Sequence, residues 1–292
     1  MERRYRCANG VVERTRFFVG DNTRIFRGKR KCSKERKQEQ NLQSCVRKVA
    51  RILNCNYTHE NGLLVTLDLD EKGLSKLLSK MDERQREILT SFRSPVGEIG
   101  TWTSLSRSKK ERAKGEEDPA VMARGLAVQG AMDALREKLG HELDLWLRRV
   151  KRKHGGKIKA LSVVSDMDHD TGEVVRCHCH VVFEAEGLSW DLLRKEWKLG
   201  SVDVRQLRKQ QDFTPIAVYL MKQVRSQPEK KKYRVTQGMI KPEVEERIVT
   251  GNTEIRVPAG AYVLERTEYH DDSYGQYIRY IPKRSSGKKR RE

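Results

Sequence analysis

The sequence predicts an α+β fold in which a central antiparallel sheet of about five strands is flanked by helices. Apolar and polar residues alternate over 63–69, which is typical of a strand with at least one buried side. Two further strand-like segments, 159–165 and 174–184, are joined by a polar turn. Ahead of them, apolar residues recur every three or four positions from Val128 to Val150, the spacing of one long amphipathic helix.

The other elements follow from start and stop signals. Ser33 is a fair N-cap for a helix over about 33–53. Asp118 and Pro119 are suited to the start of the long helix, and the glycines at 155 and 156 to its end. A polar loop is expected over 95–118. After the two paired strands we expect a helix over 189–199, a strand around 202–204 and a helix from Thr214-Pro215. Two strand-like pieces beyond 227 and a basic tail complete the chain.

The domain organisation expected from these elements has three parts. Residues 1–58 form a basic N-terminal extension with a helix, and residues 59–230 form the main domain. Residues 231–292 form a C-terminal extension with short strands and a basic tail. A chain of 292 residues is long enough to bury a sizeable core in this way.

The charge of the chain points to a polyanionic partner. Its 61 Lys and Arg exceed its 41 Asp and Glu, for a formal net charge of +20. Nucleic acid is the commonest partner of so basic a protein. A membrane is the rival, but the longest apolar runs are too short to span a bilayer. The charged N-terminus lacks a secretory pattern, so we expect a cytoplasmic protein.

The six cysteines fit a reducing compartment. They contain no Cys-x-x-Cys pair and are too sparse for a disulfide scaffold, so we expect free thiols. A zinc site built from Cys7, Cys32, Cys45 and Cys55 is the alternative, but the spacing of these residues resembles no zinc ribbon or finger.

A pair of histidines is the first candidate for chemistry. In the strand 174–184, His178 and His180 project from the same side, whereas Cys177 and Cys179 project from the other. Two imidazoles favour Mn²⁺, Zn²⁺ or Ni²⁺, and a third, oxygen ligand would make Mg²⁺ suitable as well. The alternative is that two histidines on a sheet face are incidental.

Acidic residues at the end of the neighbouring strand are the natural third ligand. Asp166 and Asp168 both lie there. Regular pairing around the polar turn places Ser165 opposite His178, so the choice between the two aspartates depends on a bulge or on the turn.

A tyrosine and a lysine are the second candidate. Tyr219 and Lys222 lie at positions i and i+3 of the helix that begins at Thr214, so they share a helical face. Ile216, Leu220 and Val224 take a different, apolar face. A Tyr-x-x-Lys motif taken alone is more often a packing tyrosine, so its meaning depends on the histidines.

Taken together, these motifs resemble those of the HUH endonucleases, and within them the rolling-circle replication initiator (Rep) proteins of small phages and plasmids. Residues 63–68 look like the structural strand motif, residues 178–180 like the metal-binding motif and residues 219–222 like the nucleophile motif, in the family's order. The likeness covers roughly residues 40–235. It departs from the family in the cysteine between the histidines and in the lack of an obvious Glu as third ligand.

The resemblance implies a ferredoxin- or RRM-like sheet and a metal-dependent endonuclease and ligase. Mg²⁺ or Mn²⁺ would be held by His178, His180 and an aspartate, and Tyr219 would attack a scissile phosphodiester with help from Lys222. The implied product is a 5′-phosphotyrosyl link and a free 3′-hydroxyl at a replication origin in a bacterial host, with polymerase and helicase borrowed from that host. Termination would reuse Tyr219 or recruit a second subunit in a dimer.

Basic side chains around this site are candidates for single-stranded DNA binding. The set comprises Arg148, Arg149, Arg152, Lys153, Arg176 and Arg225. A solvated surface explains each of them equally well. Two other functions remain open at this point: a transposase or mobilisation relaxase of the same superfamily, and a non-catalytic nucleic-acid-binding protein on a ferredoxin-like sheet.

Overall fold

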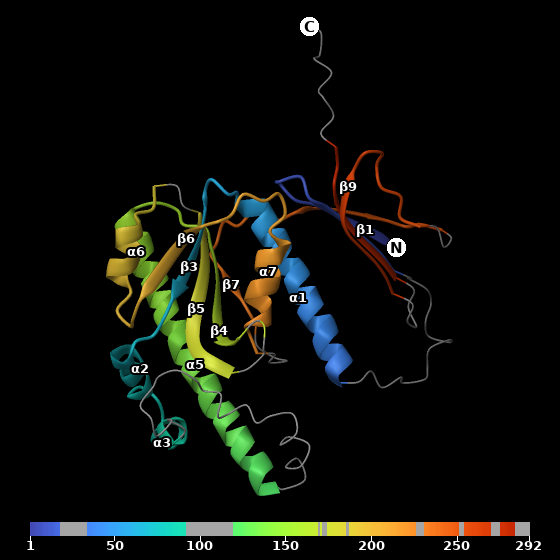
Figure 1. The fold of residues 1–292 in the computed structure, drawn as a ribbon. Helices are drawn as coiled ribbons and strands as arrows, with labels where there is room; N and C mark the ends of the chain where they lie inside the picture. The colour runs from blue at the N-terminus through green and yellow to red at the C-terminus, as the bar shows by residue number, and fades with distance from the viewer. Residues whose placement is uncertain are drawn as a thin grey trace. The chain divides into compact units, whose positions relative to one another are not determined.

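A computed structural model describes residues 1–17, 34–91, 119–168, 170, 174–184, 187–225, 231–250, 254–269 and 275–283 (Figure 1). The chain divides into two compact units. Unit 1 comprises Met1–Thr58, Gln210–Pro215 and Ile240–Glu292, and unit 2 comprises His59–Lys209 and Ile216–Met239. The described residues form two five-stranded antiparallel sheets and six helices, which confirms the α+β class.

The sheet of unit 2 has the strand order β6-β3-β5-β4-β7. Its strands are β3 (Gly62–Leu67), β4 (Ala160–Met167), β5 (Val174–Glu184), β6 (Val202–Gln206) and β7 (Arg234–Val235). Val181 of β5 pairs with Val65 of β3 and with Ser162 of β4. β5 is therefore the central strand, and its side chains are supported from both neighbours.

One face of this sheet carries the hydrophobic core of unit 2. The helices of the unit are α2 (Glu71–Leu78), α3 (Glu83–Ser91), α5 (Pro119–His154), α6 (Trp190–Glu196) and α7 (Thr214–Lys222), whose first two residues belong to unit 1. Val65 and Val181 are fully buried against Leu139 and Trp146 of α5. Burial of each such side chain stabilises the fold by about 1.5–3 kcal/mol. The apolar stripe expected on the long helix is therefore the inner wall of this core.

Most of the expected elements are present near their expected bounds. The long helix ends at His154, where Gly155 adopts a left-handed φ of 74° that stops it. The Ser189 side chain caps α6 by accepting a hydrogen bond from the Leu192 amide. The loop expected over 95–118, the cap at Asp118, most of the polar turn at 170–172 and the tail from 284 lie outside the described residues. Beyond 227 the described residues contain four strands rather than two.

Unit 1 is built around a sheet with the strand order β8-β1-β2-β10-β9. Its elements are β1 (Glu2–Arg6), β2 (Val12–Phe17), α1 (Lys34–Asn56), β8 (Glu243–Arg247), β9 (Tyr262–Tyr269) and β10 (Gly275–Ile281). α1 covers one face: its Arg51 bonds the buried Glu13 at 2.8 Å and lies 3.5 Å above the Tyr5 ring. The two extensions expected at the ends of the chain thus share one sheet, whereas residues 231–239 belong to unit 2.

None of the helices in the described part of the chain is both long enough and apolar enough to cross a lipid bilayer.

Candidate metal and nucleophile site

Strand β5 presents its two histidines on the face of the sheet opposite the core. Cys177 and Cys179 point into the core, with 2% and 0% of their surface exposed, as the strand alternation predicts. Burial raises the pKa of the Cys177 thiol to about 12. These cysteines are therefore packing residues, and only the histidine side chains face the site.

Three polar atoms meet in front of β5. The Nε2 atoms of His178 and His180 lie 3.1 Å apart. The Oε1 atom of Gln223 lies 3.2 Å from the first and 3.1 Å from the second. Gln223 directly follows helix α7, and the site's members come from β5 and from the end of this helix. The result is a nearly equilateral triangle of two nitrogens and one oxygen.

Neighbouring groups orient the lone pairs of this triangle. The Nδ1 atom of His178 lies 2.9 Å from the Arg176 carbonyl, which can only accept, so the proton sits on Nδ1 and Nε2 carries a lone pair. The Gln223 Nε2 atom donates to the Tyr219 carbonyl at 3.2 Å, which turns Oε1 toward the histidines. Two of the three atoms are thus fixed as electron-pair donors.

His180 is buried and its second ring nitrogen contacts Thr66. Burial, and then the charge of His178, lower the pKa of His180 to about 3. Its Nδ1 atom lies 3.1 Å from the Thr66 hydroxyl, which can accept or donate. When Nδ1 donates to Thr66, Nε2 also offers a lone pair to the centre of the triangle.

A β-bulge holds Gln223 in place. The pairing of β4 with β5 is regular to Ser165 opposite His178 and shifts before Met167, which leaves Asp166 as the bulged residue. The amides of Asp166 and Met167 both donate to the Gln223 carbonyl at 3.1 Å. The bulge therefore clamps the backbone of Gln223 against the strand that pairs with β5.

The side chain of Asp166 reinforces this clamp instead of joining the histidines. It is fully buried, and its Oδ1 atom accepts from the Arg225 amide at 3.3 Å. Its Oδ2 atom lies 2.9 Å from an Arg225 Nη2 atom and 3.6 Å from the Arg136 Nε atom of α5. Arg136 lies on the α5 side of the sheet, so this carboxylate faces away from the site.

The other expected ligand is engaged at the turn. Asp168 accepts a hydrogen bond from the Asp170 amide at 3.0 Å. The oxygen beside the histidines therefore comes from Gln223, and neither Asp166 nor Asp168, the ligands expected from the sequence, supplies it. One signal could have found it, because Gln223 lies four residues after Tyr219 and so shares its face at the end of the helix.

Tyr219 lies beside this triangle. Its ring centroid is 5.3 Å from that of His180, the rings are tilted by 57°, and the tyrosine is half-buried. The expected proximity of Tyr219 to the histidine pair is therefore present. Lys222 is the last residue of α7, and its side chain is exposed.

The basic residues named as DNA contacts are not gathered in one place. The candidates on α5 are Arg148, Arg149, Arg152 and Lys153, at the end of a helix that packs on the core face of the sheet. Two of them already bind Glu196 of α6: Lys153 at 2.6 Å, and Arg149 through the carbonyl at 3.2 Å. This group therefore lies on the opposite side of the sheet from Tyr219.

Of the two remaining candidates, only Arg176 shares the face of the histidines. Its Nε and Nη2 atoms are buried without a hydrogen-bond partner among the described residues, and burial lowers its pKa. Arg225 is occupied with Asp133 at 2.8 Å and with Asp166. Arg176 is thus the candidate best placed to receive a phosphate at this site.

The donor set of the triangle fits a divalent cation. Ligand atoms about 2.1 Å from an ion stand roughly 3.0 Å apart in an octahedral site and roughly 3.4 Å apart in a tetrahedral one. The observed separations of 3.1 to 3.2 Å lie between these values. No three His, Cys, Asp or Glu side chains cluster for a metal within the described ranges, and the third atom of the triangle belongs to an amide.

Comparisons with protein-family models, with curated proteins and with solved structures find no match to this chain.

Proposed function

We propose that this protein nicks and rejoins single-stranded DNA through a covalent bond to Tyr219, and that this reaction initiates rolling-circle replication. One observation supports the proposal above all others. The Nε2 atoms of His178 and His180 and the Oε1 atom of Gln223 converge within 3.2 Å of one another, and the Tyr219 ring lies beside His180. A buried cluster of lone pairs next to a phenol suits phosphodiester transesterification.

In this proposal the cation is held by the two histidines and Gln223. A bound Mg²⁺ or Mn²⁺ supplies positive charge that makes a scissile phosphate easier to attack. The imidazole pair favours Mn²⁺, and the amide oxygen also suits Mg²⁺. Thr66, the Arg176 carbonyl and the β4 bulge hold the three donors in place, so little reorganisation accompanies binding.

The nucleophile is the Tyr219 oxygen. It bonds to the phosphorus atom while the bond from phosphorus to the 3′-oxygen breaks, so the 5′ side of the DNA becomes linked to the protein. The phenol loses its proton, and the departing 3′-oxygen gains one to become a hydroxyl. Attack by a 3′-hydroxyl on the phosphotyrosine reverses these steps and reseals the strand.

Two basic side chains have assigned roles. Arg176, on the same face of β5 as the histidines, contributes positive charge beside the scissile phosphate. The exposed Lys222, three residues after Tyr219, balances the charge of the phenolate or orients the phosphate. The partners in this proposal are origin DNA and, in the bacterial cytoplasm, a host polymerase that extends the 3′-hydroxyl behind a host helicase.

The test is cleavage of labelled single-stranded oligonucleotides that tile the protein's own replicon. We expect Mn²⁺- or Mg²⁺-dependent nicking at one sequence, together with a covalent protein–DNA species on a denaturing gel. Tyr219→Phe should lose both products, and Tyr233→Phe is the matched control that should retain them. Tight binding without cleavage of any oligonucleotide in the set would favour the non-catalytic alternative.

A further inference from the structure

The sheet of unit 1 has a second face, and arginines dominate it. Residues paired across antiparallel strands share a face. Arg4 pairs with Arg14, and Glu2 pairs with Arg16 and with Arg247, so these side chains lie together. α1 covers the opposite face, on which Tyr5 and Glu13 lie. The arginine face is thus a separate surface of unit 1.

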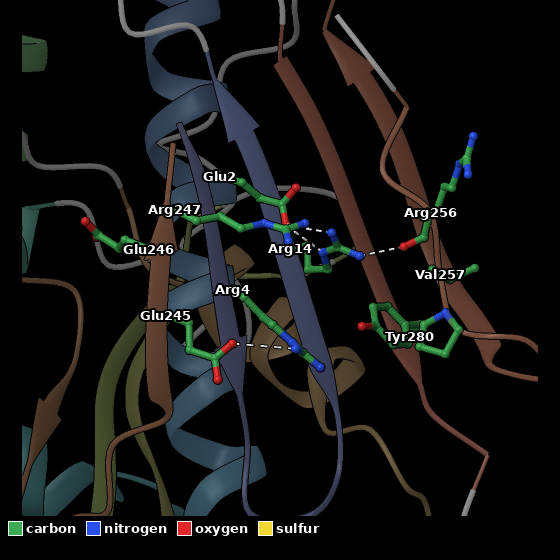
Figure 2. Close-up of a pocket in the computed structure, with 10 residues that line it drawn as sticks. Glu2, Arg4, Arg14, Glu245, Glu246, Arg247, Arg256, Val257 and Tyr280 are labelled. Carbon is green, nitrogen blue, oxygen red and sulfur yellow. Dashed lines mark hydrogen bonds and ion pairs between the residues drawn. The ribbon is translucent and has the colours of Figure 1, made fainter. Parts of the chain in front are cut away.

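A groove runs over this face (Figure 2). A pocket of about 550 Å³ lies between strands β8, β1 and β2 and the segment 256–258, and a neighbouring pocket of about 440 Å³ extends from it. The two pockets share Arg14, Arg247 and Arg256. An elongated groove of this kind suits a chain-like ligand better than a compact one.

Positive charge is in excess in the groove. The carboxylate of Glu2, 2% exposed, binds Arg14 at 2.6 Å, Arg16 at 2.7 Å and Arg247 at 3.0 Å. The two pockets are lined by five arginines and four glutamates, namely Arg4, Arg14, Arg16, Arg247 and Arg256 against Glu2, Glu245, Glu246 and Glu254. Glu243 and Glu268 also lie on this face but outside both pockets.

Two guanidinium groups in the groove have hydrogen-bonding capacity left. The Arg256 side chain is exposed and points away from the other labelled residues, while its carbonyl accepts from Arg14 (Figure 2). The Nε atom of Arg4 is buried without a hydrogen-bond partner in the described part of the chain, and its Nη1 atom is 3.5 Å from Glu245, a loose ion pair.

We propose that this groove binds the sugar-phosphate backbone of nucleic acid. Guanidinium groups pair with phosphate oxygens through two parallel hydrogen bonds, which favours phosphate over other anions. Tyr280 is the one aromatic residue that lines the two pockets, and only 1% of its surface is exposed. Bases therefore have no ring to stack on, and the groove binds without regard to sequence.

The test measures binding of the full chain to a fluorescent oligothymidylate in EDTA, where no metal-dependent reaction contributes. We compare wild type with the double variant Arg4→Gln/Arg256→Gln by fluorescence anisotropy over about 0.05–0.2 M NaCl. Loss of two phosphate contacts should weaken binding about 10- to 20-fold at 0.15 M salt and lower the slope of log affinity against log salt by about 1.4.

Matched controls separate this effect from general loss of charge. Lys72→Gln/Arg84→Gln removes two exposed charges from α2 and α3 of unit 2 and should leave binding near the wild-type value. If the double variant in the groove does not fold, Arg256→Glu alone should still weaken binding, because its side chain is exposed.

Two outcomes would overturn the proposal. One is an unchanged affinity and salt slope for the folded Arg4→Gln/Arg256→Gln protein. The other is displacement of the oligonucleotide by polyglutamate at equal charge, which would make the groove a site for acidic protein. The nicking reaction plays no part in this assay, so Tyr219→Phe should bind like wild type.

Discussion

Replacement of Gln223 by alanine should weaken Mn²⁺ binding. The substitution removes the Oε1 atom that lies 3.2 and 3.1 Å from the two histidine nitrogens. A bound ion would lose one of its three protein donors, for which we expect a 10- to 100-fold loss of affinity, or about 1.4 to 2.7 kcal/mol. The hydrogen bond to the Tyr219 carbonyl is also lost, so the free energy of unfolding should fall by about 0.5–1.5 kcal/mol.

The matching gain-of-affinity variant makes the test sharper. Gln223→Glu keeps an oxygen at this position and adds a negative charge, so it should bind Mn²⁺ more tightly than wild type. If the Gln223 amide only stabilised the fold, the partly buried carboxylate of Gln223→Glu should instead lower the free energy of unfolding without tightening Mn²⁺ binding.

The assay is titration of the full chain with Mn²⁺, in which electron paramagnetic resonance counts the free ion. Gln211→Ala is the control, because its exposed side chain lies in unit 1. Wild-type Mn²⁺ affinity in a folded Gln223→Ala protein would refute the assignment of the third donor.

Three further predictions concern the surroundings of the site. Asp166→Asn should lower the free energy of unfolding by about 3 kcal/mol and weaken Mn²⁺ binding, because it removes the buried charge that binds two arginines. Asp168→Asn is the control and should have neither effect. Thermal denaturation and the Mn²⁺ titration measure the two effects. Thr66→Val frees the His180 tautomer and should weaken Mn²⁺ binding about tenfold with little change in Tm; equal affinities would contradict this role. Burial raises the pKa of Cys177 from 9.0 to about 12, so peptide mapping should find Cys177 unmodified by iodoacetamide at pH 8 in the native protein and modified once the protein is unfolded. Because the folded state holds this proton more tightly, the contribution of Cys177 to stability is present below pH 9 and is lost as the pH rises toward 12.

Local patterns in the sequence were sufficient to predict most of unit 2. The alternation of 174–184 gave the bounds of β5 and separated His178 from Cys177, because side-chain direction in a strand depends only on the period of two. The pairing of Ser165 with His178 followed from the length of the hairpin. Both predictions rest on interactions between residues close in sequence.

The third donor and the fold of unit 1 depend on contacts that no local pattern contains. The bulge at Asp166 is stabilised by the Gln223 carbonyl, more than fifty residues away in the chain, so the direction of that aspartate could not be inferred from its own strand. In the same way, β2 pairs with β10 from the other end of the chain. The pattern of 119–150 predicted a helix but could not say which face of the sheet it covers.

The most direct test of the central claim is the identity of the residue bonded to DNA. After reaction with Mn²⁺ and a cleaved oligonucleotide, trypsin and nuclease digestion followed by mass spectrometry should find a nucleotide on the peptide of residues 210–222, in which Tyr219 is the sole tyrosine. The account predicts that this adduct disappears in Tyr219→Phe. A nucleotide on another tyrosine, such as Tyr233, or cleavage that persists in Tyr219→Phe, would contradict it.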